Sequence, residues 1–250
     1  MGIVNVTPDS FSDGGVHLDP DDAVAAARRM IEEGAAIVDV GGESTRPGHE
    51  PVSLDEELRR VVPVLERLDG VPVSVDTSKA EVARRALALG AELVNDVTAL
   101  RADPAMADLV AESGAWVCLM HWEKQPDYAD VVSDVVAFLE ERLRFAVDAG
   151  IEEERIVLDP GIGFGKTVEQ NFELVRRLPE LVALGRPVLV GFSRKSSLGR
   201  VLGDADAKTG PLSASLAAAV SAYERGATIL RVHDVRSHVE ALTVAAAVAG

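Results

Sequence analysis

Side chains that can bind or activate a substrate recur in this sequence directly after short apolar runs. They comprise three carboxylates, two amides, two imidazoles and a guanidinium: Asn5, Asp39, Asp76, Asn95, His121, Asp159, Arg231 and His233. Carboxylates and amides hydrogen-bond the edge of a flat nitrogen heterocycle, as they do with base edges. Asp76, Asn95 and Asp159 are therefore candidates to bind such a ring. The alternative role for any one of them is a turn or a helix cap, as for Asp76 before Thr77-Ser78-Lys79.

Cationic groups form a second candidate set. The chain has 25 Lys and Arg against 41 Asp and Glu, a formal charge of −16. Such a field repels phosphate backbones and anionic lipid, so we expect neither nucleic acid nor a membrane surface as partner. Arg46, Lys195 and Arg231, with His233 beside them, would then form a local positive site for an anion such as a phosphate. The alternative for Lys195 is a solvated loop charge.

Two early segments, 7–15 and 41–51, are rich in Gly, Pro, Ser, Thr and Asp. Loops of this length in a compact domain usually bind a ligand or cover a site, although flexible surface loops have the same composition. The first contains Phe11 and the second Arg46-Pro47, each of which could contact a ligand.

Other motifs fail on inspection. The glycines at 161, 163 and 165 fit neither the Walker nor the dinucleotide pattern, so they indicate a Gly-rich loop without ATP or NAD. Lys195 stands where a nucleophile elbow needs its second Gly. The five histidines show no zinc spacing, and the single Cys118 lies in an apolar run and is interpreted as a core thiol in a reducing compartment.

The elements that must position these residues are short apolar runs that alternate with amphipathic segments. The runs are 2–6, 36–40, 71–75, 92–95, 115–120, 155–158, 187–190 and 228–231, and the clearest helical segments are 21–33, 54–68, 79–89 and 131–149. Gly34, Gly90 and Gly150 follow helical segments and suit left-handed caps. Eight runs in 250 residues give about 31 residues per unit, the size of a βα repeat.

Strands that are apolar on both faces favour a parallel sheet covered by helices. We therefore predict an α/β fold, a (β/α)8 TIM barrel forming a single domain over residues 1–250, with a doubly wound open sheet as the second choice. No apolar stretch approaches the length of a membrane span, and residues 1–5 carry no basic region, so we expect a cytoplasmic protein.

Taken together, the motifs resemble those of dihydropteroate synthases over essentially the whole chain. The two most specific motifs span the early loops: Asn5-Val6-Thr7-Pro8-Asp9-Ser10-Phe11-Ser12-Asp13-Gly14-Gly15 and Gly41-Gly42-Glu43-Ser44-Thr45-Arg46-Pro47-Gly48. The later segments that match, in the family's order, are 74–77, 95–97, 119–121, 159–165, 193–196 and 231–235. The family usually has a short segment before the first strand, and many members have Met-Gln-Gly where this chain has Trp122-Glu123-Lys124.

The resemblance implies a homodimer that condenses 6-hydroxymethyl-7,8-dihydropterin pyrophosphate with p-aminobenzoate. The implied pterin residues are Asp76, Asn95, Met120, Asp159, Lys195 and Arg231. The implied p-aminobenzoate residues are Phe11, Pro47, Phe164, Lys195 and Ser196. The implied pyrophosphate residues are Asn5, Thr45, Arg46, Arg231 and His233, with Asn5 also a ligand of Mg²⁺. The implied catalytic residues are Asp9, Arg46, Asp76, Lys195, Arg231 and His233.

This assignment leads us to expect an SN1-like displacement in which pyrophosphate leaves first and ionised Asp76 stabilises the cationic methylene. The first alternative is a corrinoid-linked methyltetrahydrofolate methyltransferase, which explains Asp76, Asn95 and Asp159 but not the diphosphate set. A non-catalytic pterin-binding homologue should have lost loop or anion-binding residues that are all present here. Fold analogy alone does not exclude a phosphosugar enzyme.

Overall fold

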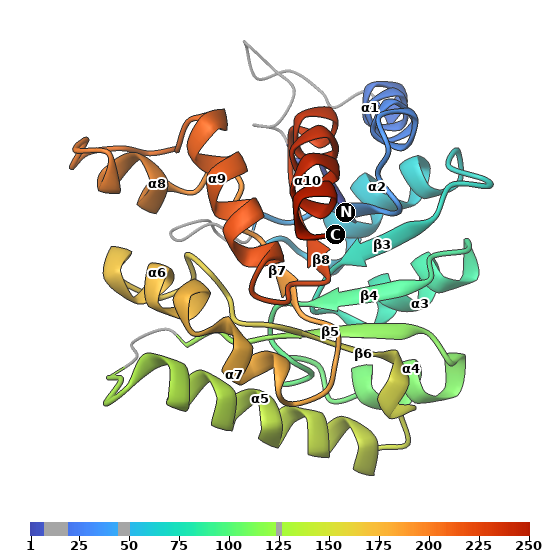
Figure 1. Ribbon diagram of the computed structural model, residues 1–250. Helices are drawn as coiled ribbons and strands as arrows, with labels where there is room; N and C mark the ends of the chain where they lie inside the picture. The colour runs from blue at the N-terminus through green and yellow to red at the C-terminus, as the bar shows by residue number, and fades with distance from the viewer. Residues whose placement is uncertain (8–19, 45–50, 124–126) are drawn as a thin grey trace.

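The computed structural model describes residues 1–7, 20–44, 51–123 and 127–250. Within them eight strands alternate with helices, and the helices lie outside the strands (Figure 1). The strands are β1 (Gly2–Asn5), β2 (Val38–Gly41), β3 (Val73–Asp76), β4 (Leu93–Asp96), β5 (Trp116–Met120), β6 (Ile156–Asp159), β7 (Leu189–Val190) and β8 (Ile229–Leu230). The helices are α1 (Pro20–Glu32), α2 (Leu54–Leu65), α3 (Ala80–Ala88), α4 (Met106–Ser113), α5 (Val131–Asp148), α6 (Val168–Arg176), α7 (Leu178–Val182), α8 (Ser196–Val201), α9 (Leu212–Tyr223) and α10 (Val235–Ala249), with one 3-10 turn at Glu153–Arg155.

The strands close into a barrel. β1 to β6 pair in parallel in sequence order, and β7 pairs with β8. Two further parallel bridges complete the ring, one between Leu158 and Val188 and one between Gly2 and Val232. The (β/α)8 barrel is therefore confirmed over the open sheet, and each predicted apolar run overlaps one strand.

The inner face of the barrel has an apolar floor below a polar rim. The floor is one buried cluster of Leu93, Cys118, Val157 and Leu189, with Met1, Ile37 and Ile229 packed against it. Alternate residues of a strand point to the same face. Two residues beyond floor residues come Asn95, Met120, Asp159, Gly191 and Arg231. Two residues further along each strand, the inner face therefore changes from packed apolar core to side chains that can bind a substrate.

Cys118 belongs to the floor and is fully buried, as predicted for a core thiol. Burial raises the pKa of this thiol well above its ordinary value, so it stays protonated and unreactive. The larger core lies on the other side of the strands, where residues such as Val40, Val94 and Leu158 pack against the helices.

Glycines end three of the predicted helical segments, and they do so in the left-handed conformation. Gly34, Gly90 and Gly150 have φ angles of 102°, 97° and 95°. A residue with a Cβ is strained there, which explains why glycine follows each helix and confirms these three predictions.

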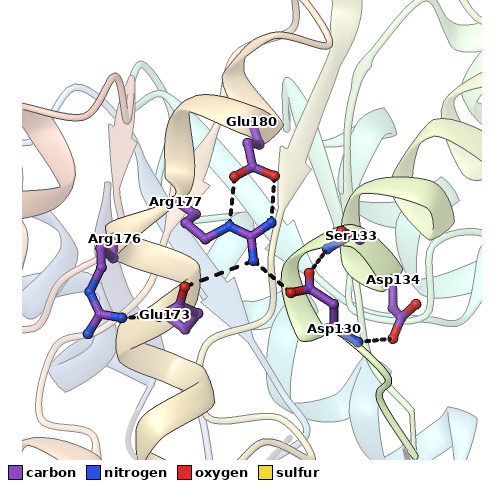
Figure 2. Close-up of polar contacts among 7 residues, drawn as sticks. All are labelled: Asp130, Ser133, Asp134, Glu173, Arg176, Arg177 and Glu180. Carbon is purple, nitrogen blue, oxygen red and sulfur yellow. Dashed lines mark hydrogen bonds and ion pairs between the residues drawn. The ribbon is translucent and has the colours of Figure 1, made fainter.

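On the outer surface Arg177 joins three helix ends (Figure 2). Its Nε and Nη2 donate to Glu180 at 2.7 and 2.8 Å, and its Nη1 donates to Asp130 Oδ2 at 2.7 Å. Asp130 is also the N-cap of α5, where it accepts a bond from Ser133 N at 2.7 Å. The fork therefore ties the junction of α6 and α7 to the start of α5.

The described parts of the chain contain no helix whose length and apolarity would let it cross a bilayer.

Candidate active site

A cavity opens at the carboxyl ends of the strands, where a barrel of this type places its active site. It contains about 460 Å³ of space between atoms, part of it open to solvent. Predicted site residues on its wall are Asp76, Asn95, Met120, Asp159, Phe164, Lys195, Arg231 and His233. Other wall residues are Ile3, Val97, Ile162, Gly191 and Ser193, to which sequence analysis assigned no role.

Strand register brings the predicted pterin residues together. Asp76 pairs with Asn95 between β3 and β4, and Met120 pairs with Asp159 between β5 and β6. All four are buried, with exposed fractions of 3–6%. Two carboxylates and an amide therefore converge on an enclosed slot with a thioether on its wall, which suits a flat ring with polar edges.

Asp39 organises this slot from within the barrel, although it was assigned no role in the site. Its Oδ2 accepts bonds from Arg231 Nε at 2.6 Å and Asn95 Nδ2 at 2.9 Å. Its Oδ1 accepts a bond from Ser74 Oγ at 2.6 Å. The sequence does carry a signal, because a carboxylate between Val38 and Val40 in an apolar run needs buried partners.

Arg231 connects Asp39 to the substrate slot. Its Nη2 donates to Asp76 Oδ2 at 2.8 Å, so one guanidinium links two buried carboxylates. Burial lowers the pKa of Arg231, but the two carboxylates more than offset this and the net shift is upward, so Arg231 is always charged. Burial raises the pKa of Asp76 to about 7, against the opposing attraction of Arg231.

Asp159 and Lys195 also line the cavity. Asp159 Oδ1 accepts a bond from Gly161 N at 2.7 Å, yet burial is the larger effect and raises the pKa of Asp159. The Lys195 ammonium donates to Ile162 O and lies 4.3 Å from the centroid of the Phe164 ring. Burial lowers the pKa of Lys195 to about 8, so a modest rise in pH removes its charge.

His233 is held by Ser193 at the end of the preceding strand unit. Ser193 Oγ lies 3.0 Å from His233 Nδ1, and it also accepts a bond from His233 N at 3.2 Å. These contacts fix the orientation of the imidazole. Ser193 is part of the Ser193-Arg194-Lys195 motif, so the motif was recognised but the role of its first residue was missed.

The remaining predicted residues do not line the cavity or are not described. Asn5 is half-buried at the end of β1, and Ser196 begins α8. Five residues lie outside the described ranges, so their predicted roles remain predictions: Asp9, Phe11, Thr45, Arg46 and Pro47.

His121 was expected in the ring of polar groups around the mouth, and the structure corrects this. Its imidazole packs edge-on against Phe138 at 4.8 Å between centroids and is absent from the cavity wall as described. Burial lowers its pKa to about 3, so it stays neutral. The Nδ1 atom faces the Lys166 ammonium at 3.0 Å, which makes it an acceptor.

The alternate glycines of the β6–α6 loop permit two close approaches. Gly161 has a φ of 68°, and a Cβ there would lie 1.9 Å from His121 O. Gly163 has a φ of 82°, and its Cβ would lie 2.6 Å from Lys195 Cδ. Through Gly161 the loop packs against the backbone at the end of β5, and through Gly163 it packs against the aliphatic part of the Lys195 side chain.

The charges on the described cavity wall are balanced rather than positive. Asp76 and Asp159 stand against Lys195 and Arg231, with His233 beside them. The predicted positive site is thus not evident from the described residues alone. Because burial raises the pKa of both carboxylates, their protonation would shift the balance toward positive.

Within the described ranges no three His, Cys, Asp or Glu side chains cluster as metal ligands. Magnesium commonly binds through one or two carboxylates together with substrate phosphates, and it keeps several waters. Asn5 at the end of β1 offers a neutral amide oxygen in place of a carboxylate. It is therefore compatible with a Mg²⁺ ion that takes most of its ligands from a diphosphate and water.

Comparison with known proteins agrees with this geometry. The family described as "Pterin binding enzyme" matches residues 1–233. A Mycobacterium leprae protein named dihydropteroate synthase is 52% identical, covering 99% of this chain and 92% of its own. A Xanthomonas albilineans dihydropteroate synthase solved with 4-aminobenzoic acid has a TM-score of 0.93 at 51% identity, covering 100% and 92%. A second structure from that organism, with 7,8-dihydropteroate, has a TM-score of 0.90 at 49% identity, with the same coverage.

Proposed function

Since the chain belongs to the dihydropteroate synthases, within the pterin-binding enzyme family, we propose that it catalyses their reaction. It is a transferase that joins 6-hydroxymethyl-7,8-dihydropterin pyrophosphate to p-aminobenzoate in folate biosynthesis. The products are 7,8-dihydropteroate and pyrophosphate. The names of the two Xanthomonas albilineans ligands support this choice of substrate and product.

One observation carries the proposal: the polar slot and the cationic groups share a single cavity. The carboxylates of Asp76 and Asp159 and the amide of Asn95 would bind the polar edge of the pterin, with Met120 against its face. Arg231 and His233, two residues apart at the end of β8, would lie at the diphosphate. The pterin ring and its diphosphate leaving group would thus be bound next to each other. A protein that only binds a pterin ring has no need of the cationic groups.

The chemistry follows from these positions. The bond between the pterin methylene and the diphosphate oxygen breaks first, and the leaving oxygen keeps the electron pair. Arg231 and His233 stabilise the growing negative charge, while the ionised carboxylate of Asp76 stabilises the cationic methylene. The neutral aromatic amine then attacks the methylene and releases its proton to solvent. The displacement is SN1-like and requires no general base.

The diphosphate would also contact Asn5, Thr45 and Arg46, and Asn5 would be the protein ligand of Mg²⁺. When bound, Mg²⁺ neutralises negative charge on the diphosphate oxygens. Phe164 and the stem of Lys195 would enclose the p-aminobenzoate ring together with Phe11 and Pro47. Ser196, at the start of α8, would bind its carboxylate, and Asp9 would assist catalysis.

We also propose a cytoplasmic homodimer. A buried free thiol such as Cys118 suits a reducing compartment. Candidate interface residues are the exposed apolar side chains Val201 and Leu202 at the end of α8 and Val244 and Val248 on α10, which are 56–82% exposed. Light scattering on the purified protein tests the dimer, and a monomer at all concentrations would rule it out.

The deciding experiment combines the purified protein, Mg²⁺, the pterin pyrophosphate and p-aminobenzoate, and measures pyrophosphate and dihydropteroate. We expect both products in equal amounts. Asp76→Ala should lower kcat by about 10²–10³, the cost of removing one such electrostatic partner. A folded protein that forms neither product would end the proposal, and an Asp76→Ala variant with near-normal turnover would reject the mechanism.

A further inference from the structure

A buried amide, Asn171, connects two segments of the proposed p-aminobenzoate compartment. It lies in α6, is 1% exposed, and was assigned no role from the sequence. Asparagine is a weak helix former, and a buried amide is costly unless its polar atoms are bonded. A leucine or alanine would suit this helix position better if packing were the only requirement.

Both polar atoms of the amide are bonded, by three partners in all. Its Oδ1 accepts a bond from Gly163 N at 2.7 Å. Its Nδ2 donates to Thr167 O at 2.8 Å and to Ser197 Oγ at 3.0 Å. Because Gly163 N is a donor and Thr167 O is an acceptor, the partners themselves determine which amide atom is oxygen and which is nitrogen.

The partners belong to the two segments that would meet p-aminobenzoate. Gly163 precedes Phe164 in the β6–α6 loop, and Ser197 follows Lys195 and Ser196 at the start of α8. The two segments also touch directly, because the Lys195 ammonium lies 4.3 Å from the Phe164 ring centroid. Asn171 bridges them from behind, away from the cavity wall described above.

The helix that carries Asn171 is itself firmly anchored. Thr167 and Gln170 form a capping box at its start, with bonds of 3.2 and 2.8 Å. The neighbouring Phe172 contacts the ring of Phe192 at 5.2 Å between centroids, just before Ser193. α6 is therefore a fixed support from which one amide sets the spacing of both segments.

We propose that Asn171 is a positioning residue that holds the Phe164 loop and the Lys195–Ser197 segment at the spacing that p-aminobenzoate needs. The inference rests on the proposed function. It predicts a larger effect on p-aminobenzoate than on the pterin pyrophosphate. Lys195 would meet both substrates, but the pterin residues Asp76, Asn95 and Met120 lie on β3 to β5 and make no hydrogen bond to Asn171 among those the structure describes.

The test measures kcat and the KM of each substrate for Asn171→Ala. We expect the KM for p-aminobenzoate to rise on the order of 10-fold, since displacing a positioned group by about 1 Å costs up to about 100-fold. The KM for the pterin pyrophosphate should rise less, because Asp76, Asn95 and Met120 keep their positions on β3 to β5. Ser197→Ala, which removes one of the three partners, should shift the same constant less.

Leu174→Ala is the matched control, because Leu174 is buried in the same helix but belongs to the apolar core. It should lower Tm without changing the ratio of the two KM values. Asn171→Ala that leaves both KM values unchanged, or raises both equally, overturns the inference. If that variant does not fold, an unchanged p-aminobenzoate KM in Ser197→Ala overturns it. A wild-type protein without synthase activity refutes the proposed function instead.

Discussion

At the scale of single residues, Asp39 shows how one side chain can organise a site that it does not line. It is completely buried, and its carboxylate accepts bonds from Ser74, Asn95 and Arg231. These groups are stable in the core only as a set, because removing the carboxylate leaves a buried guanidinium and a buried amide short of partners.

We expect Asp39→Ala to lower the free energy of unfolding by about 3 kcal/mol, as when a buried ion pair loses one partner. The reaction should slow on the order of 10–100-fold, the range seen when residues supporting a functional group are removed. Urea unfolding and the synthase assay measure the two effects. Asp108→Ala, at an exposed position on α4, should change neither. A fully active, stable Asp39→Ala variant would contradict this role.

The titration of two cavity residues predicts a bell-shaped dependence of kcat/KM on pH. Asp76, with its pKa raised by burial to about 7, must be ionised, so the rate should rise through that pH. Lys195, with its pKa lowered by burial to about 8, must be charged, so the rate should fall above that pH. Asp76→Asn should remove the rising limb, and Lys195→Arg should move the falling limb upward. A flat profile between about pH 6 and pH 9 would contradict both assignments.

At the scale of elements, the β6–α6 loop depends on glycine for contact as well as for conformation. Gly161 and Gly185 both have positive φ, of 68° and 77°. A Cβ at Gly161 would lie 1.9 Å from His121 O, whereas one at Gly185 meets nothing within 4 Å. Alanine variants at these two positions therefore distinguish the cost of backbone strain alone from the cost of strain combined with a clash that moves the loop.

Gly185→Ala should lower the free energy of unfolding by about 1 kcal/mol, the strain of a left-handed residue, and leave activity intact. Gly161→Ala should lower the free energy of unfolding by clearly more and should also reduce turnover, because the loop must move away from the end of β5. Thermal unfolding and the synthase assay compare the two variants. Equal stability and equal activity would show that the close approach at Gly161 has no consequence.

The Arg177 fork predicts a small and salt-dependent contribution from the outer surface (Figure 2). Its side chain is 29% exposed, and those of Asp130 and Glu180 are 48% exposed. Arg177→Ala should lower the free energy of unfolding only slightly, with a smaller loss in high salt. Arg144→Ala removes the more exposed ion pair between Arg144 and Glu140 on α5, and it should lower the free energy of unfolding by less. A salt-independent loss would point to packing instead of charge.

At the scale of the whole molecule, the buried carboxylates set how stability varies with pH. Burial raises the pKa of Asp76, Asp96 and Asp159, so the folded state binds protons that the unfolded chain has already released. The free energy of unfolding should therefore fall as pH rises from about 5 to about 7. Half-buried carboxylates with lowered pKa, such as Asp234 beside Arg194, titrate below that window and act in the opposite direction.

Denaturant unfolding at several pH values between about 5 and 7 measures this slope, and Asp76→Asn should make it shallower. Repulsion within a chain of formal charge −16 acts in the same direction as the pH rises. Stability that increases across this window would show that cationic partners outweigh burial at these carboxylates.

Much of the fold could be predicted from the sequence because strands and helices depend on patterns of neighbouring residues. Strands of period two and helices of period 3.6 show in the residue pattern, and parallel strands present their carboxyl ends at one edge. Asp76, Asn95, Asp159 and Arg231 were therefore placed correctly at one rim. His121 was misplaced because a polar residue after a strand can also turn outward, and only the packing of Phe138 shows that it did.

By itself the sequence determined the order of the eight units, the polar rim and the family, since each depends on short patterns and their spacing. Only the tertiary structure decided which charges pair and which remain available to a substrate. Arg231 and Asp39 are 192 residues apart, and they meet because the barrel closes around them. Their burial, in turn, determines which groups carry charge at neutral pH, and burial is a property of the closed barrel rather than of any segment.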